Sequence, residues 1–254
     1  MTIKEKEHLA VRDLTMAYGD FVIQRDLNFT IRRGDIFIIM GGSGCGKSTL
    51  MKHLIGLMTP ARGQVIYEGL SLWEAAPEER EACLRHFGVM YQSGALWSSM
   101  TLAENIALPL EEYTDLGPAQ IKDAVGFKLA LVGLSGFEEY YPSEISGGMR
   151  KRAGIARAMA LDPEIIFFDE PSAGLDPLSA ARLDDLMLEL RDSLGSTIVV
   201  VTHELASIFA IGNNSVFLDP LSKTMIAGGD PNVLLAESTD PRVRGFLTRD
   251  AEKG

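Results

Sequence analysis

The stretch that decides the fold is residues 41–48, Gly41-Gly42-Ser43-Gly44-Cys45-Gly46-Lys47-Ser48. It fits the pattern G-x-x-x-x-G-K-[ST], follows the apolar run Ile36–Met40 and opens a predicted helix from Lys47 to about Leu57. Glycines let the backbone wrap phosphate groups with its N–H groups pointing inward, and the helix N-terminus adds partial positive charge. We therefore expect a phosphate loop that binds a nucleoside triphosphate. Lys47 would reach the β- and γ-phosphates, the Ser48 hydroxyl would ligate Mg²⁺, and Thr49 would be a further nucleotide-binding residue.

Apolar runs elsewhere in the chain predict an α/β fold around this loop. Ile165–Phe168 and Ile198–Val201 each suit a strand buried on both faces, and Leu178–Leu194 between them has helical periodicity. Strand, helix, strand in that order implies parallel pairing with right-handed crossovers. Alternating apolar positions around Leu9–Leu14 and Val22–Ile31 instead predict an antiparallel sheet at the start of the chain.

Two carboxylates follow one of the predicted buried strands. Asp169 and Glu170 come directly after Ile165–Phe168, so the strand tip can deliver Asp169 to a Mg²⁺ ion held at Ser48. Glu170 can then polarise an attacking water, a contribution of typically about 10²–10⁴-fold. Alone, the pair would suit an ordinary acidic turn, but together with the phosphate loop it predicts a hydrolytic site.

Composition limits the partners. The formal net charge is −11, whereas proteins that grip nucleic acid by its phosphates usually carry a basic face. No apolar run approaches the roughly 20 residues of a membrane span, and the charged N-terminus lacks the apolar core of a signal peptide. We expect a soluble chain without a nucleic-acid partner, whose membrane role would come through another subunit.

The chain has two cysteines, Cys45 and Cys83, too few for a disulfide framework. Cys45 lies inside the phosphate loop beside Lys47 and a helix start, which favour a thiolate. A redox-sensitive thiol and a small residue that simply fits both remain open for Cys45, with the second favoured.

A third motif identifies the class. Ile145-Ser146-Gly147-Gly148-Met149, followed by the basic residues 150–152, resembles the Leu-Ser-Gly-Gly-Gln signature of the ABC ATPase family. The order of the motifs also matches from Leu9 to Gly228: phosphate loop, Gln92, signature, Asp169-Glu170, the stretch ending at Asp176, and His203. The conservative Ile145 and the loss of a polar side chain at Met149 depart from the usual signature. Neither affects the phosphate contacts expected from the Ser146 hydroxyl and the N–H groups of Gly147 and Gly148.

This resemblance implies a P-loop (RecA-like) α/β core with an N-terminal antiparallel β subdomain and an inserted helical subdomain at roughly 93–161. The ATP-binding domain would cover residues 1–228 and a C-terminal tail residues 229–254. It also implies a head-to-tail homodimer, in which the Ser146–Gly148 segment of one subunit closes over ATP on the phosphate loop of the other.

The resemblance gives roles to four further residues. Tyr18 would stack on adenine, Gln92 would approach Mg²⁺ and the attacking water, Asp176 would lie at the dimer junction, and His203 would contact the γ-phosphate. Each could instead have no part in the site: Tyr18 as an aromatic residue of a turn, Gln92 as a solvated loop residue and His203 as a structural histidine.

Three stretches narrow the class further. Gln92–Leu96, Met149 and the tail segment Asp240–Leu247 are similar to the ATPase subunits of MCE-associated lipid transporters. The resemblance implies a phospholipid transporter linking inner and outer membranes, with this subunit peripheral on the cytoplasmic face of the inner membrane. An integral permease would dock near residues 92–106, and an MCE-domain protein would belong to the assembly. The docking residues could equally be helical-subdomain core, and the tail could pack on a neighbouring subunit or be a frayed terminus.

Two rival functions remain open. The same ATPase motifs would serve an importer or exporter of small solutes, and a soluble ABC ATPase that assists assembly would use them without a membrane. The single ATPase domain and the short gap between Gln92 and Ile145 disfavour translation-type and chromosome-type ABC proteins.

Overall fold

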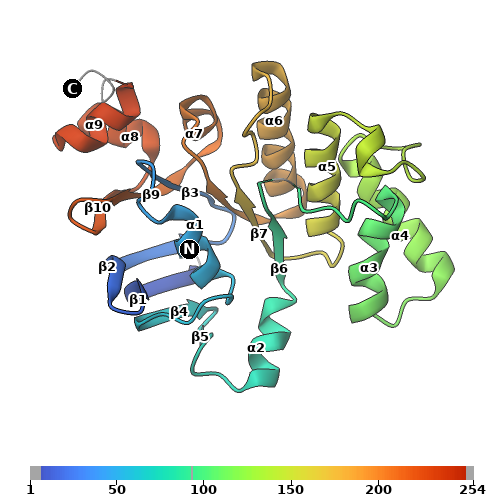
Figure 1. Cartoon of the computed structure of the whole chain (residues 1–254), viewed down its shortest axis with the longest axis horizontal. Helices are drawn as coiled ribbons and strands as arrows, with labels where there is room; N and C mark the ends of the chain where they lie inside the picture. Colours follow the sequence, from blue (N-terminus) through green and yellow to red (C-terminus); the bar gives the residue numbers. More distant parts are fainter. Residues whose placement is uncertain (1–6, 93, 250–254) are drawn as a thin grey trace, which may run out of the picture.

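The core sheet forms around β3 (Ile36–Gly41), whose residues are all buried, as a nearly continuous apolar strand requires. The computed structural model describes residues 7–92 and 94–249 (Figure 1). Residues 1–6, Ser93 and residues 250–254, which belong to the predicted domain, docking stretch and tail, lie outside the described residues.

Five further strands extend β3 into a six-stranded sheet that is parallel except for one antiparallel edge strand. In spatial order the strands are β10 (Thr224–Gly228), β9 (Asn214–Asp219), β3, β8 (Thr197–Val201), β7 (Ile165–Asp169) and β6 (Phe87–Met90). Only β10 is antiparallel to its neighbour. The predicted parallel pairing of the three apolar strands is confirmed, and β6, β9 and β10 were not predicted.

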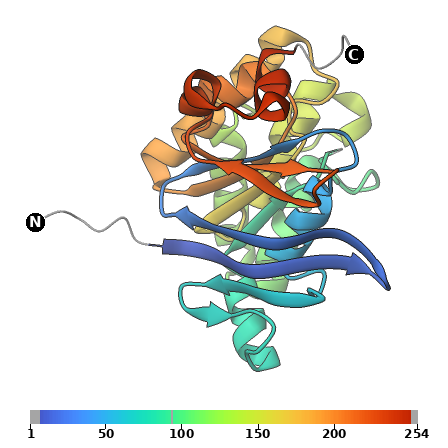
Figure 2. The ribbon, with the colours of Figure 1, turned by 90° about the vertical axis from the view of Figure 1, so that its left-hand side faces the viewer.

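The antiparallel sheet predicted at the start of the chain is also confirmed. It has the order β2-β1-β4-β5, with β1 (Glu7–Tyr18), β2 (Phe21–Arg32), β4 (Arg62–Tyr67) and β5 (Leu70–Ser71). Figure 2 shows this sheet stacked beside the core sheet. Alternate residues of β3 serve the two faces, because Phe37 and Ile39 pack toward the antiparallel sheet while Ile36, Ile38 and Met40 join the helical side of the core.

Helices pack around the two sheets (Figure 1). They are α1 (Lys47–Leu54), α2 (Pro77–Leu84), α3 (Leu102–Tyr113), α4 (Pro118–Leu131), α5 (Gly147–Ala158), α6 (Pro177–Leu194) and α7 (Leu205–Ile211). Helices α3 to α5 form a group at one end of the sheet, within the range 93–161 expected for the helical subdomain. Helix α1 ends at Leu54, earlier than predicted, since Gly56 adopts a φ of 73°. The domain boundaries themselves stay predictions.

The described part of the tail forms two short helices that pack against the core of the same subunit. Helices α8 (Pro231–Glu237) and α9 (Pro241–Thr248) lie above the edge of the core sheet (Figure 2). Val243 and Leu247 are buried in the main core cluster, and the rings of Phe246 and Phe217 meet edge to face at 5.2 Å. Packing of the tail on a neighbouring subunit stays a prediction. Across the described ranges, no helix has the length and apolar character needed to cross a bilayer.

The burial of Leu247 can be tested by stability. Leu247→Ala is expected to lower the free energy of unfolding by about 2–5 kcal/mol, because it leaves a cavity in a packed core. Arg244→Ala on the exposed face of the same helix is the control and should change it by less than about 0.5 kcal/mol. Urea denaturation measures both, and equal midpoints for the two variants would mean that α9 is frayed in solution.

Candidate functional site

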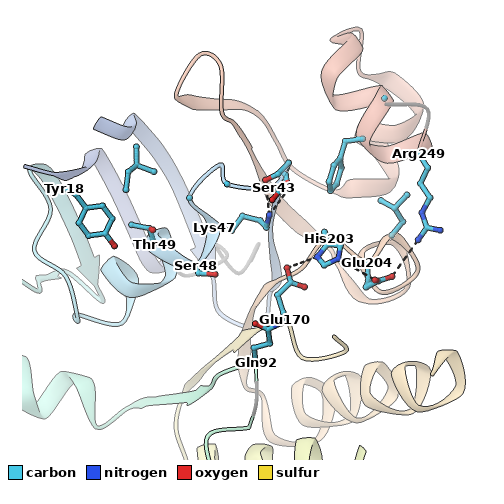
Figure 3. Close-up of a pocket in the computed structure, with 18 of the residues that line it drawn as sticks. Tyr18, Ser43, Lys47, Ser48, Thr49, Gln92, Glu170, His203, Glu204 and Arg249 are labelled. Atoms are coloured by element: carbon cyan, nitrogen blue, oxygen red, sulfur yellow. Dashed lines mark hydrogen bonds and ion pairs between the residues drawn. The ribbon is translucent and has the colours of Figure 1, made fainter. Parts of the chain in front are cut away.

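A cavity of about 1130 Å³ lies at the carboxyl ends of the core strands (Figure 3). It is open to solvent and collects residues from the phosphate loop, the β1–β2 hairpin, the ends of β6, β7 and β8, and the tail. The residues that line it are Tyr18, Phe21, Ile23, Gly41, Gly42, Ser43, Gly44, Gly46, Lys47, Ser48, Thr49, Gln92, Glu170, His203, Glu204, Leu205, Gly245, Phe246 and Arg249.

The phosphate loop owes its shape to glycine. Gly41 has a φ of 147°, and a side chain there would place its Cβ 2.3 Å from the Leu218 carbonyl oxygen, so only glycine fits. Lys47 starts α1 and its Nζ donates to the carbonyl oxygens of Gly41 and Gly42 at 3.0 and 3.2 Å. Its ammonium therefore lies over the loop, next to the N-terminus of the helix, where anions bind favourably.

Ser48 and Asp169 form the part of the site that suits a divalent cation. Ser48 Oγ donates to Asp169 Oδ1 at 3.1 Å. Burial raises the pKa of the Asp169 carboxyl, while the Ser48 hydrogen bond and the nearby charges of Lys52, Lys47 and Lys151 lower it. A hydroxyl and a carboxylate oxygen beside a phosphate loop are oxygen donors of the kind Mg²⁺ uses together with substrate phosphates, so these residues fit the ion.

Glu170 and His203 form a pair at the tips of β7 and β8. His203 Nδ1 lies 2.8 Å from Glu170 Oε1, and since an ionised carboxylate only accepts, Nδ1 carries the proton of this hydrogen bond. Oε2 of Glu170 is buried and has no hydrogen-bond partner among the described residues. Both side chains face the cavity in Figure 3. The pairing holds the Glu170 carboxylate in one orientation at the wall of the cavity.

Two aromatic residues form the other end of the cavity. Tyr18 and Phe21 are cross-strand partners on either side of the two-residue turn between β1 and β2, and both are exposed. The ammonium of Lys223 lies 4.7 Å from the centre of the Phe21 ring. Tyr18 was predicted to stack on a base and Phe21 was not considered, although the two-residue turn was the signal that would have paired them.

The tail supplies residues that the sequence reasoning missed. Gly245, Phe246 and Arg249 line the cavity beside the end of β8, and Arg249 Nη2 lies 3.8 Å from Glu204 Oε2. No local motif marks these residues, because only the docking of α9 brings them to the phosphate loop.

The predicted signature residues are not part of this cavity. Ser146 Oγ caps α5 by accepting a hydrogen bond from Met149 N at 3.2 Å, which leaves the N–H groups of Gly147 and Gly148 at the helix N-terminus. Asp176 caps α6 in the same way through Ser179 N at 3.0 Å, and bonds to Ser179 lower the pKa of its carboxyl. The two caps are neighbours, since a Cβ at Gly148 would lie 3.8 Å from Ser179 Oγ.

A second groove, of about 530 Å³, lies between the helical subdomain and the edge of the core sheet. Its lining is mainly apolar and comprises Phe87, Gly88, Val89, Trp97, Leu108, Pro109, Glu112, Tyr113, Arg157, Ala158 and Leu161. Of the stretch 92–106 predicted to dock a permease, Gln92 instead lines the first cavity and Trp97 lines this groove. The remaining lining residues were not predicted.

The environment of Cys45 does not favour the thiolate that its sequence neighbours suggested. Its side chain is 1% exposed, and burial raises the pKa of the thiol despite the opposing charge of Lys47. Burial likewise raises the pKa of Cys83 to about 12. At neutral pH both side chains are therefore thiols rather than thiolates, which favours the view of Cys45 as a small residue that fits the loop.

The comparisons with known proteins agree with this geometry. The family model described as ABC transporter matches residues 24–173, and the chain belongs to that family. The fold is also that of ABC cassettes: cbiO1 from Clostridium perfringens, part of the transporter complex cbiONQ, superposes with a TM-score of 0.84 at 25% identity over 98% of both chains. The cassette MJ0796, solved as a dimer bound to ADP and Pi, has a TM-score of 0.78 at 26% identity over 87% of this chain and 98% of its own.

Two relatives in sequence bear on the kind of transporter. The chain is 37% identical to the intermembrane phospholipid transport system ATP-binding protein MlaF of Haemophilus influenzae, over 96% of this chain and 91% of that protein. It is 43% identical to the probable ribonucleotide transport ATP-binding protein mkl of Mycobacterium tuberculosis, over 94% of this chain. This match spans only 66% of the length of the mycobacterial protein. The predicted family and the resemblance to MlaF proteins are thereby confirmed.

The two thiols are expected to resist modification in the folded protein. Because both side chains are buried and burial raises the pKa of each, a thiol-specific reagent should label them only after denaturation. The Cys83→Ser variant isolates Cys45 and serves as the matched test. Rapid labelling of this variant under native conditions would restore the redox-sensitive interpretation of Cys45.

Proposed function

We propose that this protein binds Mg²⁺-ATP and hydrolyses it as the ATPase subunit of a membrane transporter that moves phospholipid between two membranes. The observation that supports the ATPase assignment is one cavity lined by the phosphate loop and the Glu170–His203 pair, with Asp169 bonded to Ser48 of that loop. The MlaF relatives carry the phospholipid assignment.

Each group has a chemical role in this proposal. The loop N–H groups and Lys47 would hold the β- and γ-phosphates. Ser48 and Asp169 would hold Mg²⁺, an ion that would supply positive charge next to the transferring phosphoryl group. The Glu170 carboxylate would accept a proton from water while that water attacks the γ-phosphorus and the bond to ADP breaks. His203 orients Glu170 and lies near the γ-phosphate, and Gln92 lies near the water. Tyr18 and Phe21 offer aromatic faces to adenine.

The site requires a second subunit in this proposal. Ser146, Gly147 and Gly148 present a capped helix N-terminus on a surface outside the cavity, which suits an anion held by another chain. A head-to-tail homodimer would bring this N-terminus to the γ-phosphate of the partner and place Asp176 at the junction. The dimeric state of the cassette MJ0796 supports this arrangement.

The apolar groove is the proposed docking site for a helix of the permease. It combines exposed apolar side chains, including Trp97, which is 58% exposed, with a shape that suits a helix laid in a groove. The subunit would then be peripheral on the cytoplasmic face of the inner membrane, with an MCE-domain protein in the assembly. The mycobacterial relatives, named for ribonucleotide transport, keep a small-solute transporter as the second candidate.

Two substitutions separate binding from hydrolysis. Glu170→Gln is expected to keep ATP affinity, lose at least about 10²-fold in turnover and accumulate as an ATP-bound dimer, because only the proton acceptor is removed. Lys47→Ala should lose ATP affinity and form no dimer. Calorimetry and size-exclusion chromatography with light scattering measure these outcomes, and a Glu170→Gln monomer with undiminished turnover would refute the assigned role.

The Trp97→Glu variant tests whether the permease docks in the apolar groove. A charge in an apolar docking surface costs desolvation, so the variant should lose the permease during purification from detergent-solubilised membranes. Phe127→Glu is the matched control, since Phe127 is similarly exposed on α4 but does not line the groove. Equal permease recovery with both variants would exclude the groove as the docking site.

The proteins and lipids that co-purify with the tagged chain test the assignment to a phospholipid transporter. Mass spectrometry of native complexes should find a permease and an MCE-domain protein, with bound phospholipid. A permease with a solute-binding protein would favour the second candidate. Recovery with soluble proteins alone would contradict both transporter assignments and indicate an assembly factor.

A further inference from the structure

Lys151 on helix α5 is a buried lysine that reaches the backbone of the nucleotide site. Its residue is 7% exposed, and its Nζ donates to the carbonyl oxygen of Gln92 and, at 3.4 Å, to that of Glu170. Lysine is rarely buried without partners because its desolvation is costly. The same side chain therefore joins the loop after β6 to the tip of β7. Its two acceptors belong to Gln92 and Glu170, the residues proposed to lie near the attacking water.

The electrostatic surroundings of Lys151 belong to the same site. Burial lowers the pKa of its ammonium group, whereas the charges of Glu170 and Asp169 raise it. The two carboxylates are thus the nearby charges that favour the protonated form of Lys151. In return, the charge of Lys151 is one of those that lower the pKa of the Asp169 carboxyl.

The contact made by Lys151 is one of three along α5. One turn further on, a Cβ at Gly154 would lie 3.0 Å from the Cα of Gly94, so a larger residue there would push the loop away from the helix. After another turn, Arg157 Nη1 donates to the Ala95 carbonyl oxygen. Residues spaced by three share a helix face, and this face of α5 holds the described residues of the segment 92–95.

The other basic residues at the start of α5 point elsewhere. Arg150 Nη1 donates to the Ile145 carbonyl oxygen at 2.8 Å, and Arg152 Nη1 donates to the Val132 carbonyl oxygen at 2.9 Å. All three basic side chains therefore stabilise backbone carbonyl groups, but only Lys151 among them reaches Gln92 and Glu170. Arg152 consequently offers a matched control on the same helix.

Glu170 needs such support because of its backbone. It is a non-glycine residue with a φ of 49°, a strained conformation that persists only where neighbouring contacts hold it. Its N–H donates to the Val201 carbonyl oxygen at 2.8 Å, and its own carbonyl oxygen accepts from Ala173 N at 3.2 Å as well as from Lys151. The Lys151 contact is the one that comes from the helical subdomain.

We propose that Lys151 is a positioning residue that sets Gln92 and Glu170 relative to each other and ties both to helix α5. The N-terminus of that helix carries Ser146–Gly148, so the segment that would contact the nucleotide of a partner subunit is rigidly linked to the hydrolytic groups of its own chain. The inference rests on the roles proposed above for Gln92 and Glu170.

The test compares steady-state ATPase kinetics and ATP affinity of full-length Lys151→Met, Lys151→Arg and Arg152→Met. Lys151→Met is expected to lower kcat by about 10- to 100-fold, as misplacement of reacting groups does. Its ATP affinity should stay within about threefold of the parent, since no phosphate contact is removed. Lys151→Arg should recover most of kcat, and Arg152→Met should retain the parental kcat.

The outcomes separate this inference from the function on which it rests. Parental kcat in Lys151→Met, or an equal fall in Arg152→Met, would overturn the positioning role. If Lys151→Met does not fold, Lys151→Gln is assayed with the same expected fall in kcat, and parental kcat there would equally overturn the role. Glu170→Gln is assayed in parallel, and normal turnover in that variant would instead overturn the proposed hydrolytic mechanism.

Discussion

The turn from β3 into α1 is the constraint on which the site depends. Gly41 leaves a strand that is buried on both faces and passes so close to the Leu218 carbonyl group that no side chain fits. The loop is therefore held by the core sheet rather than by its own hydrogen bonds alone. Because β8, β7 and β6 are parallel to β3 and lie beyond it in that order, their carboxyl ends meet the same cavity. They deliver His203, Asp169 with Glu170, and Gln92 to one edge, the usual location of ligands in open α/β sheets.

The site contains a strained backbone conformation and buried polar groups, and each of these lowers the stability of the fold. Glu170 has a left-handed backbone conformation, which costs on the order of 1–3 kcal/mol, and one of its carboxylate oxygens is buried without a partner among the described residues. Lys151 is buried behind it. These costs are offset by two large apolar clusters, one on each face of the core sheet. A rigid sheet can hold a strained carboxylate in place, and a carboxylate so held is ready to accept a proton without reorganisation.

Sequence reasoning located the parts of the site that lie at the tips of apolar strands. The phosphate loop, Asp169, Glu170 and His203 each follow a short buried run, so a local pattern marks them. Phe246 and Arg249 follow no such run, because their place depends on how the tail helix α9 packs against β9, where the rings of Phe246 and Phe217 meet. Lys151 was noticed only as part of a basic helix start, since the direction of its side chain depends on long-range packing. The separation of Ser146–Gly148 from the cavity was implied by family resemblance and could not be derived from spacing.

In the proposed mechanism, each nucleotide site is completed by a second subunit. The most direct test of this mechanism is Ser146→Asp in the Glu170→Gln background, with Ser146→Asn as the neutral control, since both residues still cap the helix. ATP affinity of the separate chains and ATP-driven mass increase are measured together. Ser146→Asp is expected to bind ATP normally but stay monomeric, because its charge repels the phosphates of the partner's nucleotide, whereas Ser146→Asn is expected to dimerise. A dimer with Ser146→Asp, or a loss of ATP affinity in the monomer, would contradict the mechanism.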